Sequence, residues 1–147
     1  MNSFIEVLRM QPKTPLRKQD FQQLSQFRYQ LRCFLRYSED ICRRYDLTSL
    51  QYQLLLHLRG FEGREWATVG ELAERLQAKH HGTVALIDRC EQMGLVERRQ
   101  GREDRRQIEI HLQKEGARRV EAIAEAHKPE LKHLQEEMRF PSWLSES

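Results

Sequence analysis

The chain has 147 residues, 32% of them charged and 39% hydrophobic, and a formal net charge of +3. This length suits one domain that is large enough to bury a core. No apolar run approaches the roughly 18 residues of a membrane span. Residues 1–10 carry Glu6 and lack a long apolar stretch, which argues against a signal peptide. We therefore expect a globular, cytoplasmic protein with no membrane partner.

The N-terminal third is expected to form an arm and one long helix. Phe4, Ile5 and Leu8 indicate a short helical turn, which prolines at 12 and 15 interrupt. A helix then runs from about residue 20 to residue 45. Its apolar residues recur on one broad, aromatic face that needs a large partner surface. They are Leu24, Phe27, Leu31, Phe34, Leu35, Ile41, Cys42 and Tyr45.

Capping boxes mark the start of the next two helices. Thr48 with Gln51, and Thr68 with Glu71, have the three-residue spacing in which a side chain and a backbone amide satisfy each other at a helix start. The first of these helices is expected to end at Gly60.

Residues 68–112 show the order helix, turn, helix, hairpin. A helix at 68–76 is followed by a turn at 77–78 and by a second helix over about 79–93, which Gly94 ends. The inward positions of the second helix are Val84, Ile87 and either Cys90 or Met93.

After residue 94 the spacing of the apolar residues changes from that of a helix to that of a strand, which predicts a hairpin. Residues 95–99 can form one strand, and apolar and polar side chains alternate over residues 107–112, which predicts a half-buried strand. Its apolar members are Ile108, Ile110 and Leu112. This order is that of a winged helix-turn-helix. The second helix of such a unit fits the DNA major groove, about 12 Å wide, with its N-terminal residues toward the base edges.

The same stretch resembles the MarR family of bacterial transcription regulators. The matching runs, in the family's order, are 72–76 (Leu-Ala-Glu-Arg-Leu), 84–96 (Val-Ala-Leu-Ile-Asp-Arg-Cys-Glu-Gln-Met-Gly-Leu-Val) and 104–106 (Asp-Arg-Arg). The resemblance extends over about residues 20–138. There are two departures: Cys90 stands where leucine is usual, and residues 112–116 replace the family's leucine-threonine start to the next helix. The resemblance implies a DNA-binding transcription regulator, usually a repressor.

The C-terminal part is expected to be helical again. Residues 115–128 read as one helix, and Pro129 is expected to kink or split it, or to take the first position of a last helix. Leu131, Leu134 and Met138 continue the apolar stripe. Apolar helices on both sides of the winged unit favour subunit pairing, although packing within one chain is the alternative. The resemblance implies a homodimer joined through the first and last helices.

We therefore expect a mainly α fold with a small β-hairpin wing, in one MarR-type domain over residues 1–147. Residues 1–46 form the N-terminal arm and a dimerisation helix, 47–112 the winged helix-turn-helix, and 113–147 the C-terminal dimerisation helices. A dimer would present two recognition helices to a pseudo-palindromic site.

The first cluster of candidate DNA contacts lies at the start of the recognition helix. Lys79 is expected to meet a phosphate, and His80 and His81 to reach base edges or phosphates. Gly82 costs a helix about 1 kcal/mol relative to alanine. Its missing side chain would permit close approach to DNA, whereas a frayed first turn is the alternative. Further candidates are Thr83 and Ala85.

The second cluster is the wing. Five arginines there face only Glu103 and Asp104, which suits a local polyanion contact, although a solvated charged hairpin would show the same charges. They are Arg98, Arg99, Arg102, Arg105 and Arg106. Arg102 and Arg105 are expected near the tip. The resemblance implies that Arg106 reaches the minor groove and that Asp104 helps to position it.

The resemblance also implies a small aromatic or phenolic ligand, bound between the dimer helices and the DNA-binding lobe. An aromatic core with no ligand is the alternative. Candidates for that site are Phe27, Arg28, Arg32, Phe34 and Tyr52, the arginines meeting a carboxylate.

Three other functions are considered. The cysteines lack metal-ligand spacing and indicate reduced thiols, but a redox-sensing regulator that uses Cys33, Cys42 or Cys90 stays an alternative. His127 and His133 give no convincing metal set, and no cofactor is expected. An enzyme is not expected, because no phosphate loop, serine elbow or metal motif is found. A protein-binding winged-helix adapter is the remaining alternative, against which the basic wing argues.

Overall fold

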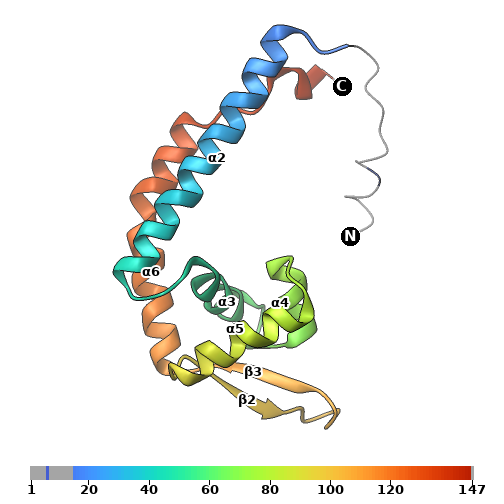
Figure 1. Cartoon of the computed structure of the whole chain (residues 1–147), viewed down its shortest axis with the longest axis vertical. Helices are drawn as coiled ribbons and strands as arrows, with labels where there is room; N and C mark the ends of the chain where they lie inside the picture. The colour runs from blue at the N-terminus through green and yellow to red at the C-terminus, as the bar shows by residue number, and fades with distance from the viewer. Residues whose placement is uncertain (1–5, 7–14, 147) are drawn as a thin grey trace.

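A computed structural model describes residue 6 and residues 15–146, and it shows a long arm with a lobe at one end (Figure 1). The arm consists of α2 (Lys18–Arg44) and α6 (Lys114–Glu137). The lobe contains α3 (Ser49–Gly60), β1 (Trp66–Thr68), α4 (Val69–Leu76), α5 (His80–Gln92), β2 (Val96–Gln100) and β3 (Ile108–Leu112), and a short 3₁₀ helix, η1 (Ser142–Glu146), ends the chain.

Two expectations concern the ends and the membrane. Phe4, Ile5, Leu8 and Pro12, on which the N-terminal helical turn depends, lie outside the described residues. Across residue 6 and residues 15–146, no helix combines the length and the apolar character that crossing a membrane requires.

The helices of the lobe begin and end where local signals predicted. The Thr48 amide donates to Gln51 Oε1 at 2.9 Å, and the Gln51 amide donates back to Thr48 Oγ1 at 3.1 Å. Thr68 and Glu71 form the same reciprocal pair at the start of α4. After α5, Gly94 has a φ of 73°, and its amide donates to the Glu91 carbonyl at 2.9 Å. Both capping boxes and the terminating glycine are therefore confirmed.

The sheet has a strand that the sequence did not predict. Its order is β1-β3-β2, and both pairs are antiparallel, with Trp66 opposite His111 and Arg98 opposite Ile110. At three residues, β1 is too short to show a period. It makes β3 the central strand and leaves β2 as an edge.

The third strand also changes which residues of β3 are buried. Ile108 is 41% exposed, whereas Glu109 and His111 are buried. The Trp66 ring stacks on His111 at 5.9 Å between centroids, and Glu109 Oε1 lies 2.9 Å from His111 Nε2. The expected alternation is therefore wrong for β3: Trp66 of β1, opposite His111, packs its ring on the face that was assigned to solvent, and β1 ends at Thr68, short of Ile108.

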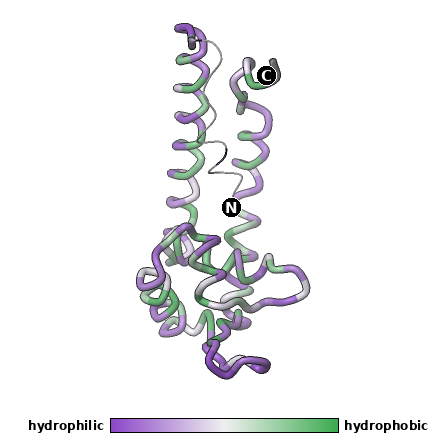
Figure 2. Tube along the Cα trace, turned by 90° about the vertical axis from the view of Figure 1, so that its right-hand side faces the viewer, coloured by the Kyte–Doolittle hydropathy of each residue, from purple (hydrophilic) through white to green (hydrophobic). Residues whose placement is uncertain are grey.

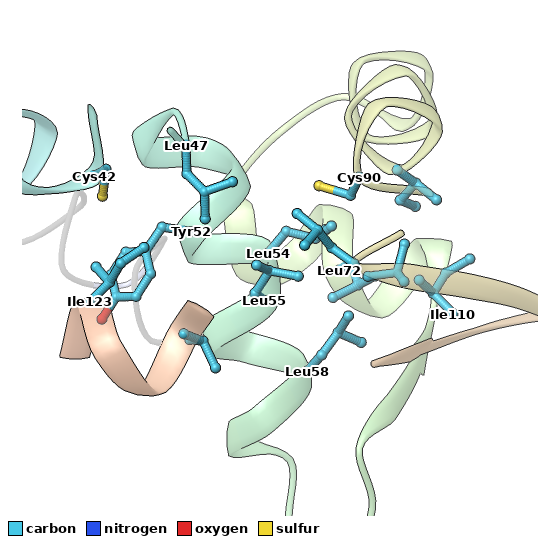
Figure 3. Packing of buried hydrophobic residues seen from close by; sticks show 14 of the residues in the cluster. Cys42, Leu47, Tyr52, Leu54, Leu55, Leu58, Leu72, Cys90, Ile110 and Ile123 are labelled. Atoms are coloured by element: carbon cyan, nitrogen blue, oxygen red, sulfur yellow. The ribbon is translucent and has the colours of Figure 1, made fainter. Parts of the chain in front are cut away.

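The core is centred on α3, which contacts α2, α4, α5, α6, β1 and β3. Figure 3 shows Leu54, Leu55 and Leu58 of α3 between side chains from the rest of the lobe, and all three are fully buried. Tyr52, on the same helix, lies toward Ile123 of α6 (Figure 3). The position of α3 therefore ties the lobe to the lower end of the arm.

Pro129 does not split the C-terminal helix. A single helix runs from Lys114 to Glu137 with Pro129 inside it, so the expected break or new helix start is wrong. Contacts to α2 hold the helix on both sides of the proline. Before it, His127 Nε2 lies 2.7 Å from Ser38 Oγ, and after it Gln30 Nε2 donates to the Glu137 carbonyl at 2.9 Å.

Candidate nucleic-acid interface

The start of α5 is open to solvent. Lys79 is the N-cap residue, and Lys79, His80, His81 and Gly82 are all exposed. No side chain caps this end and no acidic residue lies in its first turn. The free backbone amides and the positive end of the helix dipole therefore point outward and favour an anion. A Cβ added at Gly82 would meet nothing within 4 Å, so packing within the chain does not require glycine there.

One predicted contact of α5 faces the wrong way. Thr83 is fully buried, and its hydroxyl donates to the Lys79 carbonyl at 3.0 Å. The expectation that Thr83 lies on the DNA-facing surface is wrong, because Thr83 lies four residues before Ile87 and so shares the buried face of α5 with it. Ala85 is exposed as expected. Arg89, one turn beyond Ala85, is also exposed, and helical spacing from His81 could have identified it.

The five arginines of the wing separate into two groups. Arg98 binds Asp88 and Glu91 of α5, and Arg99 binds Glu97 at 3.0 Å on its own strand. The other three lie beyond the end of β2 and are exposed. They are Arg102, Arg105 and Arg106. Figure 2 shows the lowest part of the chain, the β2–β3 turn, as strongly hydrophilic. Of these five arginines, Arg98 alone is partly buried, and the other four, Arg99 included, are exposed.

Asp104 contacts Arg106 within the wing turn. Its Oδ1 accepts from the Arg106 amide at 3.0 Å and lies 3.4 Å from Arg106 Nε. The Arg106 side chain is 94% exposed, so this ion pair contributes little to stability. Its effect is on geometry: the carboxylate fixes the backbone at Arg106 and leaves the guanidinium accessible.

The five candidate ligand residues do not form one site. Phe34 and Tyr52 both pack on His127, with ring centroids 6.4 and 5.2 Å away. Phe27 instead packs on Phe140, 5.2 Å away, farther along the arm. The remaining two candidates, Arg28 and Arg32, are exposed. Within one chain the five residues do not line one pocket, because about two helical turns separate Phe27 from Phe34 along α2. A ligand site that a dimer would complete stays a prediction.

His127 forms a buried joint between the arm and the lobe. It is 4% exposed, and its Nδ1 lies 2.7 Å from the Ile123 carbonyl oxygen. A carbonyl can only accept, so Nδ1 carries a hydrogen, and Nε2 lies within hydrogen-bond distance of the Ser38 hydroxyl, 2.7 Å away. With Tyr52 stacked on the ring, this joint connects α2, α3 and α6.

Two hollows of the surface lie elsewhere. One of about 1040 Å³ is at the far end of the arm, where Lys18, Phe21, Arg139 and Phe140 are among its lining residues. A smaller one of about 420 Å³ follows the turn from α4 to α5. Neither is lined by any of the five ligand candidates. Among the residues that the structure describes, no three His, Cys, Asp or Glu side chains could hold a metal ion together.

The thiols differ in their access to solvent. Cys42 and Cys90 are fully buried, whereas Cys33 is exposed. Burial raises the pKa of the Cys42 thiol, and it raises the pKa of Cys90 to about 11. Since the thiolate is the reactive form, the two buried thiols are poor sensors.

We expect native protein to react with a disulfide reagent at one thiol, that of Cys33, and denatured protein at all three. Peroxide treatment should leave DNA affinity unchanged, because burial raises the pKa of Cys42 and Cys90 and so disfavours their reactive thiolate form. The measurement is thiol titration followed by DNA binding with and without peroxide. Loss of binding that a Cys33→Ser variant prevents would instead establish a redox switch.

Comparison with known proteins agrees with this geometry. A model of the MarR family matches residues 45–107. The solved structure of AbsC, a MarR family transcriptional regulator from Streptomyces coelicolor, is similar with a TM-score of 0.75 and 21% identity, covering 91% of this chain and 90% of that one. A MarR family protein from Bacillus stearothermophilus gives 0.70 and 26%, covering 85% and 86%. A mutant of S. aureus MepR bound to an oligodeoxyribonucleotide gives 0.61 and 21%, covering 78% and 83%. No curated protein matches the chain.

Proposed function

We propose that this chain is a member of the MarR family of transcription regulators and that it binds double-stranded DNA sequence-specifically as a homodimer. The observation that carries the proposal is the placement of two exposed basic elements, the start of α5 and the wing turn, next to each other on the lobe (Figure 1). The arm lies away from both of them (Figure 1).

The two elements would have different roles on DNA. The start of α5 enters the major groove, where Lys79 meets a phosphate while His80 and His81 reach base edges. Gly82 and Ala85 let the helix approach closely. The wing follows the neighbouring backbone, with Arg102, Arg105 and Arg106 at phosphates or in the minor groove and Asp104 holding the turn.

The arm supports the proposal of a homodimer. Of the 27 residues of α2, the buried ones are Ser38, Ile41 and Cys42, all near its C-terminal end. In α6 the buried residues all precede Pro129. Figure 2 shows hydrophobic residues recurring along the whole length of both helices. Exposed apolar side chains on the arm and the C-terminal segment include Phe21, Tyr29, Leu35, Leu131 and Phe140. A second copy, packed arm against arm, would cover them.

On this basis the chain is one functional domain. Residues 1–46 and 113–147 pair two copies, and residues 47–112 read DNA. A dimer of this kind presents two recognition helices, so its operator is a pseudo-palindrome with half-sites about one helical turn apart or a multiple of it. Its place of action is the cytoplasm of a bacterium, in line with the family.

We further propose that the protein is a repressor that a small aromatic or phenolic molecule releases from DNA. The His127 joint supports this proposal, since it sits where the arm meets the lobe and its partners come from α2, α3 and α6. A molecule that changes the joint would change the separation of the two recognition helices. It acts as a signal only if it binds the DNA-competent and DNA-incompetent forms with different affinity.

The experiment that tests the function is a selection on sheared DNA from the protein's own source. We expect the wild type to enrich one pseudo-palindrome. The Arg106→Ala variant should lose this enrichment, bind all duplex DNA more weakly, and show a salt dependence of log Kd shallower by about one unit, because one phosphate contact is gone.

An Arg118→Gln variant is the matched control. It also removes one positive charge, but from an arginine on α6 that pairs with Glu115 of the same helix. Its enrichment and salt slope should equal those of the wild type. Retention of all DNA without an enriched sequence would contradict sequence-specific binding. No retention even at low salt would favour a protein-binding adapter.

A further inference from the structure

We propose that Arg98 is a positioning residue that locks the wing to the recognition helix and does not itself contact DNA. This inference rests on the proposed function, since it assigns one arginine of the basic wing to geometry instead of to phosphate binding.

The contacts of Arg98 all lead to α5. Its Nη2 donates to Asp88 Oδ1 at 2.5 Å and its Nη1 to Glu91 Oε1 at 2.7 Å. Its backbone amide donates to the other oxygen of the same carboxylate, Glu91 Oε2, at 2.9 Å. The Arg98 side chain is 29% exposed, less than the 52% of Arg99 beside it. The guanidinium is therefore occupied on the side that a phosphate would need.

The backbone bond shows why Glu91 matters to the wing. Strand β2 is an edge of the sheet, so amides on its outer side have no partner strand. The Arg98 amide is one of these, and the Glu91 carboxylate accepts it. One side chain of α5 thus binds both the backbone and the guanidinium of the same strand residue. A bidentate pair of this kind fixes orientation as well as distance.

The charges at this place argue for the same role. Asp88 and Glu91 lie three residues apart on the recognition helix, so they share a face. Two carboxylates near a DNA-binding surface repel phosphates, and one arginine neutralises only half of that charge. They therefore weaken long-range attraction. What they supply is a fixed anchor for the strand that carries the wing turn.

A wing that is already fixed against α5 binds DNA more tightly, because binding does not have to order it. The recognition helix and the wing turn must meet two neighbouring grooves at once. If the wing moved freely against α5, binding would have to order it, and that cost would reduce affinity and selectivity. Arg98 therefore acts on DNA recognition through Arg102, Arg105 and Arg106 of the turn.

The experiment compares Glu91→Gln and Arg98→Gln, each measured on the selected operator and on random duplex over a range of salt. Electrostatics alone predicts that Glu91→Gln binds more tightly, because a negative charge is removed. The proposed positioning role of Arg98 predicts the opposite result. Both variants should bind the operator about tenfold more weakly, and both should lose less affinity for random duplex. The double variant should be little weaker than either single one, because both remove the same interaction.

The dependence of log Kd on salt distinguishes a positioning role of Arg98 from a phosphate contact. Arg98→Gln should keep the wild-type slope, whereas Arg105→Ala should lower it by about one unit. Arg98→Lys should recover only part of the affinity, since an ammonium lacks the guanidinium's fork. Asp88→Asn, which leaves the Glu91 contacts in place, gives a milder loss and serves if Arg98→Gln does not fold.

The outcomes separate this inference from the proposed function. If the wild type binds no DNA, the proposed function is wrong and the inference with it. If the wild type binds its operator, but Glu91→Gln binds more tightly and Arg98→Gln loses about one unit of slope, Arg98 is a phosphate contact and the inference is overturned.

Discussion

Replacing Phe21 by glutamate is expected to convert the dimer into a monomer and to weaken operator binding by about a hundredfold or more. Phe21 is 55% exposed on the first part of α2, where no residue is buried within the chain. In the proposed dimer it lies against the second copy, so a carboxylate there would be desolvated without a partner. A monomer has one recognition helix and loses the gain from holding two half-sites together.

The measurement is the mass in solution by sedimentation equilibrium, with a chain of 17.7 kDa, followed by operator binding. Leu50→Glu is the control, because Leu50 is 52% exposed but belongs to α3 in the lobe. It should stay dimeric. A wild-type protein of single-chain mass, or a Phe21→Glu variant that remains a dimer, would contradict pairing through the arm.

Leu55→Ala is expected to lower the free energy of unfolding by about 2–5 kcal/mol, the range for emptying a packed core position. Leu55 is fully buried in the helix on which the lobe is centred (Figure 3). Its neighbour Leu56 is 39% exposed, so Leu56→Ala changes the same atoms in the same helix and should cost less than about 1 kcal/mol. Urea unfolding of the two variants measures both values. Equal losses would contradict the placement of α3.

The wing shows how far the sequence predicts a DNA-binding surface. Five arginines in a short stretch indicated a basic cluster, and three of them do lie exposed in the turn. The ion pairs of Arg98 with Asp88 and Glu91 were not predicted. Charge counting along the chain cannot reveal it, because the partners are on the preceding helix and meet the arginine only after the chain reverses at Gly94.

The burial of β3 and the packing of the ligand candidates also depend on neighbours that are distant in the sequence. Glu109 and His111 look like solvent-facing residues of an alternating strand, yet both are buried, and the ring of Trp66, on β1 far earlier in the chain, stacks on His111. Phe27 and Phe34 share the apolar face of one helix in the sequence pattern, yet the structure packs them against different residues. Periodicity identifies a face, but it does not say which neighbour covers each part of it.

The sequence by itself determined the elements of this protein: the capping boxes at Thr48 and Thr68, the helix end at Gly94, and the order helix, turn, helix, wing. These features depend on hydrogen bonds and dihedral angles within three or four residues, so they can be read locally. Only the tertiary structure decided the third strand, the His127 joint and the pairing of Arg98 with Asp88 and Glu91 of α5. Each of these requires side chains distant in sequence to meet, and burial and pairing are properties of that meeting.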